Sequence, residues 1–115
     1  MVTIKIKPLS VNEAWKGRRF KTDKYNVYED AVLLLLPKIK IPKAPYQVTI
    51  ELGFSNKASD LDNPVKLILD ILQKKYGIND KDIYRLIINK CIVPKSLEYF
   101  KFKIENKFDY YKTII

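Results

Sequence analysis

Histidine is absent from the 115-residue sequence, and cysteine occurs only once. Without histidine the chain cannot use Ser-His-Asp or Cys-His catalysis, nor any phosphodiester chemistry based on histidine. A single cysteine excludes an internal disulfide framework and a zinc knuckle. Cys91 lies in an apolar run, so we expect it to be a small buried residue.

Long hydrophobic runs are also missing. The longest uninterrupted apolar run near the middle, residues 31–36, is stopped by Pro37 and is far too short to cross a membrane. Residues 2–7 alternate apolar with polar side chains, which predicts a strand and not a signal peptide. Glycine and proline are few, so disorder is not expected. We therefore expect a cytoplasmic protein with no membrane association.

Acidic residues are outnumbered by basic ones. The chain has 22 Lys and Arg against 13 Asp and Glu, which gives a formal net charge of +9. If several of the acids gather in one site, the remaining surface is more basic still. Such a surface favours a polyanion as partner. The alternative is a lysine-rich protein whose charge serves solubility alone.

The pattern of elements predicts one domain over residues 1–115, an α/β fold of the α+β kind. Strands are expected at residues 2–7, 46–54, 83–93 and 97–108. One helix should run from Thr22 or Asp23 to about Leu36, and a second over residues 64–76. The order is then β-α-β-α-β-β, a mixed sheet with two main helices packed on it.

Periodicity also predicts which side chains are buried. In the first helix the expected stripe is Val27, Ala31, Leu34 and Leu35. In the second it is Val65, Ile68, Leu69, Leu72 and Tyr76. The strand at 83–93 should be buried on the face of Tyr84, Leu86, Ile88 and Ile92. The last strand should point Phe100, Phe102 and Ile104 inward, with Lys101, Lys103 and Glu105 outward.

An acidic segment precedes the second helix. A proline disfavours helix in the residue before it and fits the first helical position, so Pro64 predicts a helix start with Asn63 as its N-cap. We expect the segment from Asp60 to Asp62 to be extended, which points these two carboxylates the same way. Gly77 is a natural end for the helix, after lysines at 74 and 75.

The polar face of this second helix carries Lys66, Asp70 and Gln73. A lysine in the first turn opposes the helix dipole, and Lys before Asp at i,i+4 is the weaker order of that ion pair. Residues that defy local preference without visible gain are expected at functional sites. The alternative is a capped, solvated helix with a surface ion pair.

A short polar turn after Gly77 adds further acids. It leads directly into the apolar run from Ile83, so Asp80 or Asp82 should return toward the edge of the sheet that carries Asp60 and Asp62. Carboxylates gathered in this way repel one another unless a cation lies between them. Oxygen ligands without His or Cys select Mg²⁺ or Mn²⁺, and no small-molecule cofactor beyond the metal is expected.

The segment before the first helix is basic and aromatic. Five basic residues fall within nine positions, with Trp15 and Phe20 interleaved: Lys16, Arg18, Arg19, Lys21 and Lys24. Such a segment suits phosphate contacts. The alternative is a solvated loop whose tryptophan packs into the core. We favour nucleic-acid contact for the basic residues and a core position for Trp15.

These motifs resemble the RusA family of Holliday-junction resolvases. The resemblance rests on DxDNxxKxxxD at residues 60–70 and on Asn79-Asp80 before a strand. The PLSVN run at 8–12 and the GRR run at 17–19 are also similar to that family. The resemblance implies a RusA-like domain and a Mg²⁺-dependent homodimer that nicks four-way DNA junctions symmetrically.

The resemblance also assigns roles to residues. It implies Asp60 and Asp62 as paired metal ligands, Asp80 as the third, and Lys66 as a catalytic lysine. The family has two adjacent acids where this chain has Asn79-Asp80, so Asp80 and Asp82 both stay open as the third ligand, with Asp80 preferred. The set of residues expected to support the ligands from a second layer is Asp70, Asp82 and Asn63.

Two other functions remain compatible with the sequence. A non-catalytic nucleic-acid-binding module would use the acids as helix caps and in ion pairs. A Mg²⁺ nuclease for flaps or other branched DNA would share every site residue and differ only in substrate. Nucleic-acid binding without metal-dependent cleavage would favour the first function, whereas the second differs from junction resolution in the shape of the DNA alone.

Overall fold

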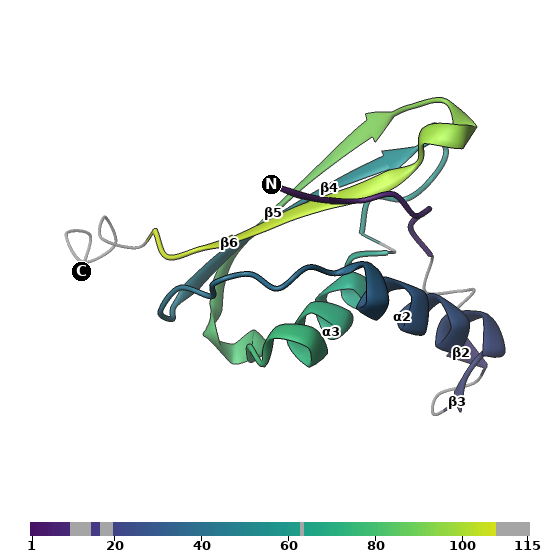
Figure 1. Cartoon of the computed structure of the whole chain (residues 1–115). Helices are drawn as coiled ribbons and strands as arrows, with labels where there is room; N and C mark the ends of the chain where they lie inside the picture. Colours follow the sequence, from purple (N-terminus) through teal and green to yellow (C-terminus); the bar gives the residue numbers. More distant parts are fainter. Residues whose placement is uncertain (10–14, 17–19, 63, 108–115) are drawn as a thin grey trace.

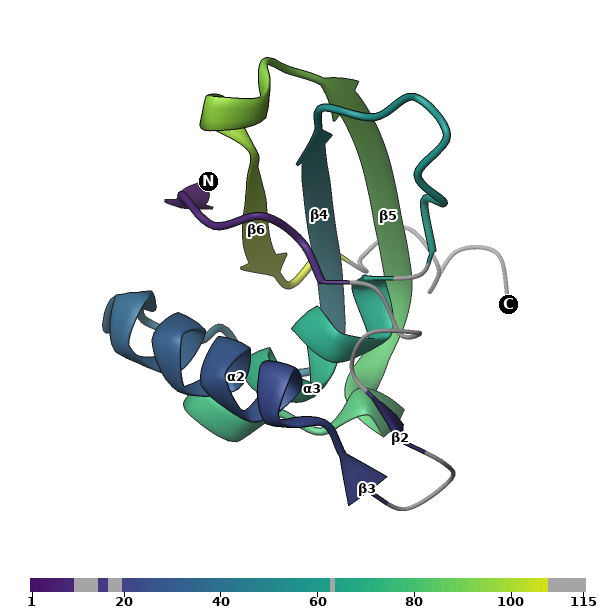
Figure 2. The ribbon, with the colours of Figure 1, turned by 90° about the vertical axis from the view of Figure 1, so that its right-hand side faces the viewer.

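A computed structural model of the chain describes residues 1–9, 15–16, 20–62 and 64–107, with the backbone alone at 15, 16 and 20. Its centre is a four-stranded sheet in the order β1-β6-β4-β5 (Figures 1 and 2). The strands are β1 (Val2–Ile4), β4 (Tyr46–Phe54), β5 (Ile83–Ile92) and β6 (Tyr99–Glu105). β4 pairs in parallel with β5 and antiparallel with β6, so the sheet is mixed as predicted.

Two helices complete the α+β fold in the described part of the chain. They are α2 (Asp23–Leu35) and α3 (Val65–Tyr76), and both lie on the same face of the sheet (Figure 1). The order β-α-β-α-β-β is confirmed. A short hairpin of β2 (Trp15–Lys16) and β3 (Phe20–Lys21) is added before α2. Neither helix has the length and apolar character needed to span a bilayer, within the residues described.

The core lies between β4, β6 and the helices. Val48, Ile50 and Leu52 of β4 are fully buried, and Phe100 and Phe102 of β6 lie beside them. The inward direction predicted for Phe100 and Phe102 is confirmed. The opposite face of the sheet is polar, with Lys101, Lys103 and Glu105 forming ion pairs there. An antiparallel pair with one solvated face shows this alternation.

Local signals fix the helix ends. The Thr22 side chain accepts a hydrogen bond from the Tyr25 backbone N–H, which makes Thr22 the N-cap of α2. Helix α3 ends at Gly77, whose φ of 68° is the left-handed conformation that favours glycine. Helix α3 begins at Val65 after Pro64. The predicted cap Asn63 lies outside the described residues.

The predicted buried stripe of α2 is wrong. Val27, Leu34 and Leu35 are 69%, 88% and 52% exposed, and Ala31 is half-buried. The helix instead buries Tyr25, Tyr28, Glu29 and Val32. Its C-terminal half is apolar on every side, so the pattern does not orient it. The two tyrosines and Glu29 settle the orientation, because they pack toward the core and α3.

The predicted burial of β5 is also wrong. Tyr84, Leu86 and Ile92 are exposed, Ile88 is half-buried, and Cys91 is exposed instead of buried. The cause is strand order: β5 is an edge strand, and among the described residues it pairs with β4 alone. Strand β6 begins at Tyr99, because a 3₁₀ turn at Lys95–Leu97 follows Pro94.

Candidate active site

One crossover connection carries the acidic residues. Strand β4 ends at Phe54, a connecting segment of residues 55–62 leads into α3, and a 3₁₀ turn at Asp80–Asp82 leads into β5. Because β4 and β5 are parallel, α3 runs back along the sheet between them. Both ends of α3 therefore present acidic residues near β5.

A hollow of about 310 Å³ lies between α3 and β5. Lys66, Asp70 and Gln73 follow one another along one side of it, spaced three and four residues apart as one face of α3 requires. Asp62 lies on the same side, just ahead of the helix. Asp80 joins them from the turn before β5. Four apolar side chains form the remaining wall: Val65, Leu69, Leu86 and Ile88.

The structure brings together four of the predicted site residues: Asp62, Lys66, Asp70 and Asp80. Asp60 and Asp82 do not line the hollow. Asp60 is exposed, and the chain bends at Leu61 and Asp62 instead of continuing as an extended segment. Asp82 is half-buried at the end of the turn.

Hydrogen bonds hold Asp80 against α3. Its backbone N–H donates to Gln73 Oε1 at 3.3 Å. The Asn79 side chain caps the turn by accepting from the Lys81 backbone N–H at 3.1 Å. The backbone N–H of Asp82 donates to the Asn79 carbonyl at 3.0 Å. This geometry favours Asp80 over Asp82 as the acid that joins Asp62.

Asp70 is the half-buried acid of the hollow. Burial raises the pKa of its carboxyl above the ordinary value, and the charges of Asp80 and Glu29 add to this effect. The positive charges of Lys66 and Lys21 oppose it in part. The hollow is thus a place where an added cation would relieve repulsion between carboxylates.

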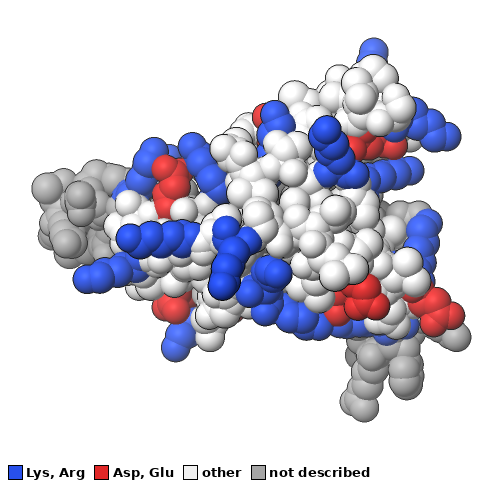
Figure 3. Space-filling model, viewed as in Figure 1, with Lys and Arg blue, Asp and Glu red and all other residues white. Residues whose placement is uncertain are grey.

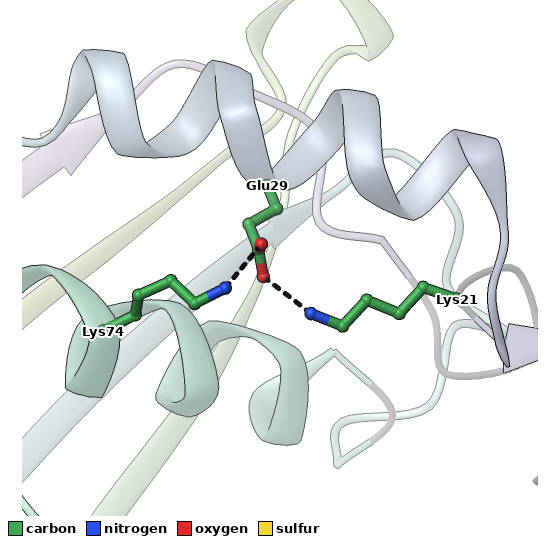
Figure 4. A network of polar contacts seen from close by, with 3 residues as sticks. All are labelled: Lys21, Glu29 and Lys74. Carbon is green, nitrogen blue, oxygen red and sulfur yellow. Dashed lines mark hydrogen bonds and ion pairs between the residues drawn. The ribbon is translucent and has the colours of Figure 1, made fainter. Parts of the chain in front are cut away.

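A buried carboxylate links α2, α3 and the basic hairpin (Figure 4). Lys74 donates to Glu29 Oε1 at 2.8 Å, and Lys21 donates to Oε2 at 3.4 Å. Burial alone would raise the pKa of Glu29, but the hydrogen bond from Lys74 and the charges of both lysines outweigh it, so the pKa is lowered. The pattern of the sequence did not reveal this network, because Glu29 resembles any surface glutamate of a helix.

Of the five predicted DNA-binding residues, the structure describes the side chains of Lys21 and Lys24. Lys21 lies in the network with Glu29, and its ammonium is 4.9 Å from the centre of the Tyr25 ring. Lys24 is exposed on the first turn of α2. The side chain of Lys16, and Arg18 and Arg19 entirely, lie outside what the structure describes, as does the side chain of Trp15. Lys and Arg side chains spread over the visible face, with acids in small clusters (Figure 3).

The donor set of the hollow suits a hard divalent cation. Within the described ranges, no three Cys, Asp or Glu side chains come close enough to hold a metal by themselves. Mg²⁺ keeps several water ligands and usually takes one or two protein carboxylates. Asp62 and Asp80, with no sulfur or imidazole on the lining, fit that requirement.

Comparison with known proteins identifies the family. The family model of endodeoxyribonuclease RusA matches residues 6–97. This span includes α2, β4, α3, the turn and β5, and so the whole lining of the hollow. The chain therefore belongs to the RusA family of endodeoxyribonucleases, which are generally metal-dependent and act on branched DNA. No curated protein matches the chain significantly.

Proposed function

We propose that this protein is a Mg²⁺-dependent endodeoxyribonuclease that resolves Holliday junctions by paired symmetric nicks, with Mn²⁺ able to replace Mg²⁺. One observation carries the proposal: in a chain of the RusA family, a lysine and three carboxylates converge on one hollow beside α3. The net charge of +9 supports a DNA substrate, because Lys and Arg neutralise phosphates. Such a substrate favours a cytoplasmic location, and we take residues 1–115 as one RusA-like domain.

The residues of the hollow divide the work. Asp62 and Asp80 would hold the cation, and the exposed Asp60, two residues before Asp62, would reach it from the connecting segment. Bound Mg²⁺ supplies an activated water and polarises a phosphate. Lys66, exposed at the rim, places a positive charge where negative charge develops on the phosphate. Asp70, one turn further along α3, would orient Lys66 or a metal-bound water.

We also propose that the protein acts as a homodimer, because a four-way junction has two-fold symmetry and needs two opposed sites. The stripe of α2 formed by Val27, Ala31 and Leu34 supports this assembly. Its members follow at i, i+4 and i+7, yet Val27 and Leu34 are among the most exposed large apolar residues described. A helix stripe that looks buried in sequence and is exposed in one copy suits a second copy as its cover.

The test is cleavage of a labelled synthetic four-way junction with Mg²⁺, beside a linear duplex of the same sequence. The wild type should nick the junction on two opposed strands and leave the duplex intact. Asp62→Asn should lower the rate about 100-fold or more while retaining junction binding. Asp30→Asn removes an exposed acid of α2 and should cleave normally.

The other outcomes separate the alternatives. Tight junction binding without nicks in Mg²⁺ or Mn²⁺ would make the protein a binding module and overturn the proposal. Equal cleavage of flaps and four-way junctions would make it a general nuclease for branched DNA. Normal cleavage by Asp62→Asn would show that the hollow is not the active site.

A further inference from the structure

We propose that Lys90 is a positioning residue that fixes the connecting segment ahead of Asp60 and Asp62, and thereby sets their affinity for a divalent cation. The inference rests on the proposed function. Lys90 lies on β5, about thirty residues away in sequence from the acids it serves, and it does not line the hollow. Its action is therefore through the backbone of residues 57–59.

The Lys90 ammonium bridges two carbonyls of the connecting segment. Its Nζ donates to the carbonyl oxygen of Lys57 at 2.8 Å and to that of Ser59 at 2.6 Å. Ser59 directly precedes Asp60. The segment between β4 and α3 runs beside β5, which brings its backbone within reach of a strand residue (Figure 2). The ammonium also lies 5.8 Å from the centre of the buried Phe54 ring.

The rest of the segment is anchored at its other end. The Glu98 carboxylate accepts from both the backbone N–H of Ser55 at 3.1 Å and its hydroxyl at 3.0 Å. Asn56 then forms a tight turn, with its side chain accepting from the Ala58 N–H at 2.8 Å and its carbonyl from the Ser59 N–H at 3.2 Å. Beyond this turn, Lys90 holds the carbonyl of Ser59, the residue directly before Asp60.

Other lysines of the sheet behave differently. Lys101 pairs with Glu51, and Lys103 pairs with Glu105, both on the polar face. Lys90 lies in register with Leu52 of β4, whose side chain is in the core, and directs its half-buried side chain to backbone carbonyls. A half-buried lysine that satisfies two carbonyls contributes orientation, because its removal leaves both acceptors to water and frees the segment to move.

The experiment measures cation binding and cleavage separately. Lys90→Met keeps the aliphatic stem and removes the donors, and Lys103→Met is the matched control on the polar face. Mn²⁺ binding to the protein without DNA is followed by electron paramagnetic resonance. Lys90→Met should weaken Mn²⁺ binding about 10-fold and raise the Mg²⁺ concentration for half-maximal cleavage similarly. Lys90→Arg, which keeps donors, should stay within about threefold of wild type on both measures.

Junction binding in EDTA is the control for misfolding, because a general loss of structure would weaken it. It should be unchanged in Lys90→Met and in Lys103→Met. Wild-type Mn²⁺ affinity in a folded Lys90→Met protein would overturn the positioning role, whereas absence of Mn²⁺ binding and cleavage in the wild type would overturn the proposed function itself. If Lys90→Met does not fold, Lys90→Gln takes its place, because its shorter side chain keeps donors but cannot span both carbonyls. Weakened Mn²⁺ binding by folded Lys90→Gln supports the inference, and wild-type affinity overturns it.

Discussion

Lys74 of α3 donates a 2.8 Å hydrogen bond to Glu29 of α2, whose side chain is only 10% exposed. This contact and the one from Lys21 join both helices to the hairpin. We expect Glu29→Gln, which keeps the shape and removes the charge, to lower the free energy of unfolding at pH 7 by about 1–3 kcal/mol. Urea denaturation of the two proteins measures the difference.

The effect should depend on pH. The pKa of Glu29 is lowered in the folded protein from 4.5, so its contribution is present above pH 4.5 and lost as the pH falls through the lowered pKa. The pKa of Lys74 is raised from 10.5, chiefly by its hydrogen bond to Glu29, so the upper limit lies above pH 10.5. The stability difference between wild type and Glu29→Gln should therefore narrow only at the two extremes. A constant difference down to pH 3 would contradict the network.

Removing the charge of Asp70 should change stability in the opposite direction from removing that of Glu29. Its folded pKa is raised from 3.8 by burial, so ionised Asp70 costs stability at neutral pH. Asp70→Asn should stabilise the protein at pH 7 by less than about 1 kcal/mol, since the group is partly solvated. The gain should shrink as the pH falls through the raised pKa of folded Asp70 and vanish well below pH 3.8, where Asp70 is protonated in both the folded and the unfolded protein. Thermal melts from pH 3 to 8 test this, and a destabilised variant at pH 7 would contradict it.

Gly53 and Gly77 should respond differently to alanine. A Cβ at Gly53 would collide with the Tyr99 ring, whose hydroxyl is held by Glu51 at 2.6 Å. Gly53→Ala should cost about 1–3 kcal/mol through overpacking. Gly77 has open space around it, so Gly77→Ala should cost only the left-handed strain of about 1–2 kcal/mol.

The two glycines are separated by a second substitution. In a Tyr99→Ala background the cost of Gly53→Ala should disappear, whereas that of Gly77→Ala should persist. Urea denaturation of the single and double variants completes the cycle. A Gly53→Ala penalty that survives removal of the ring would place its cause in the backbone of β4 and not in the collision.

The variants Asp80→Asn and Asp82→Asn should differ in their rate of junction cleavage. Asp80 lines the hollow and is held by Gln73, whereas Asp82 does not line it. Asp80→Asn should lower junction cleavage about 100-fold or more, and Asp82→Asn should leave it within a few-fold of wild type. Single-turnover kinetics at saturating Mg²⁺ compares them. The reverse ranking would assign the third ligand to Asp82.

The α2 stripe should control assembly. Leu34 is 88% exposed, and Leu34→Lys places a charge in the proposed dimer surface. Light scattering should then report a dimer for the wild type and a monomer for Leu34→Lys at micromolar concentration. Asn26→Lys adds the same charge at an exposed position of α2 outside the stripe and should remain dimeric. A monomeric wild type would refute the homodimer.

The sequence predicts well what neighbouring residues decide. The bounds of β4 and the Gly77 end follow from local backbone chemistry, and both are confirmed. The sequence left Thr22 and Asp23 open as the cap of α2, and Thr22 is the cap. The approach of Asp62, Lys66 and Asp70 also follows from local spacing, because they occupy one face of α3 and its entry.

What depends on tertiary arrangement could not be predicted. Ile92 and Cys91 were expected to be buried, yet they are exposed because β5 is an edge strand of the described sheet, paired with β4. The alternation of apolar and polar residues along a strand does not reveal its place in the sheet. Glu29 became a buried ion-pair centre only through the packing of α2 on α3. Lys90 carried a visible signal, a lysine inside an apolar strand, but its carbonyl partners lie in another segment.

The residues that line the hollow all fall within 62–88, one continuous stretch that runs from the end of the connecting segment through α3 and the turn into β5. The hairpin of β2 and β3 belongs to a different stretch, before α2, and is joined to α3 through Glu29 of α2, which pairs with both Lys21 and Lys74. The lining of the hollow and the hairpin are therefore encoded by two separate segments of the sequence. If the hairpin contacts DNA as the sequence predicts, substitutions there can change the choice of DNA without altering the residues that line the hollow.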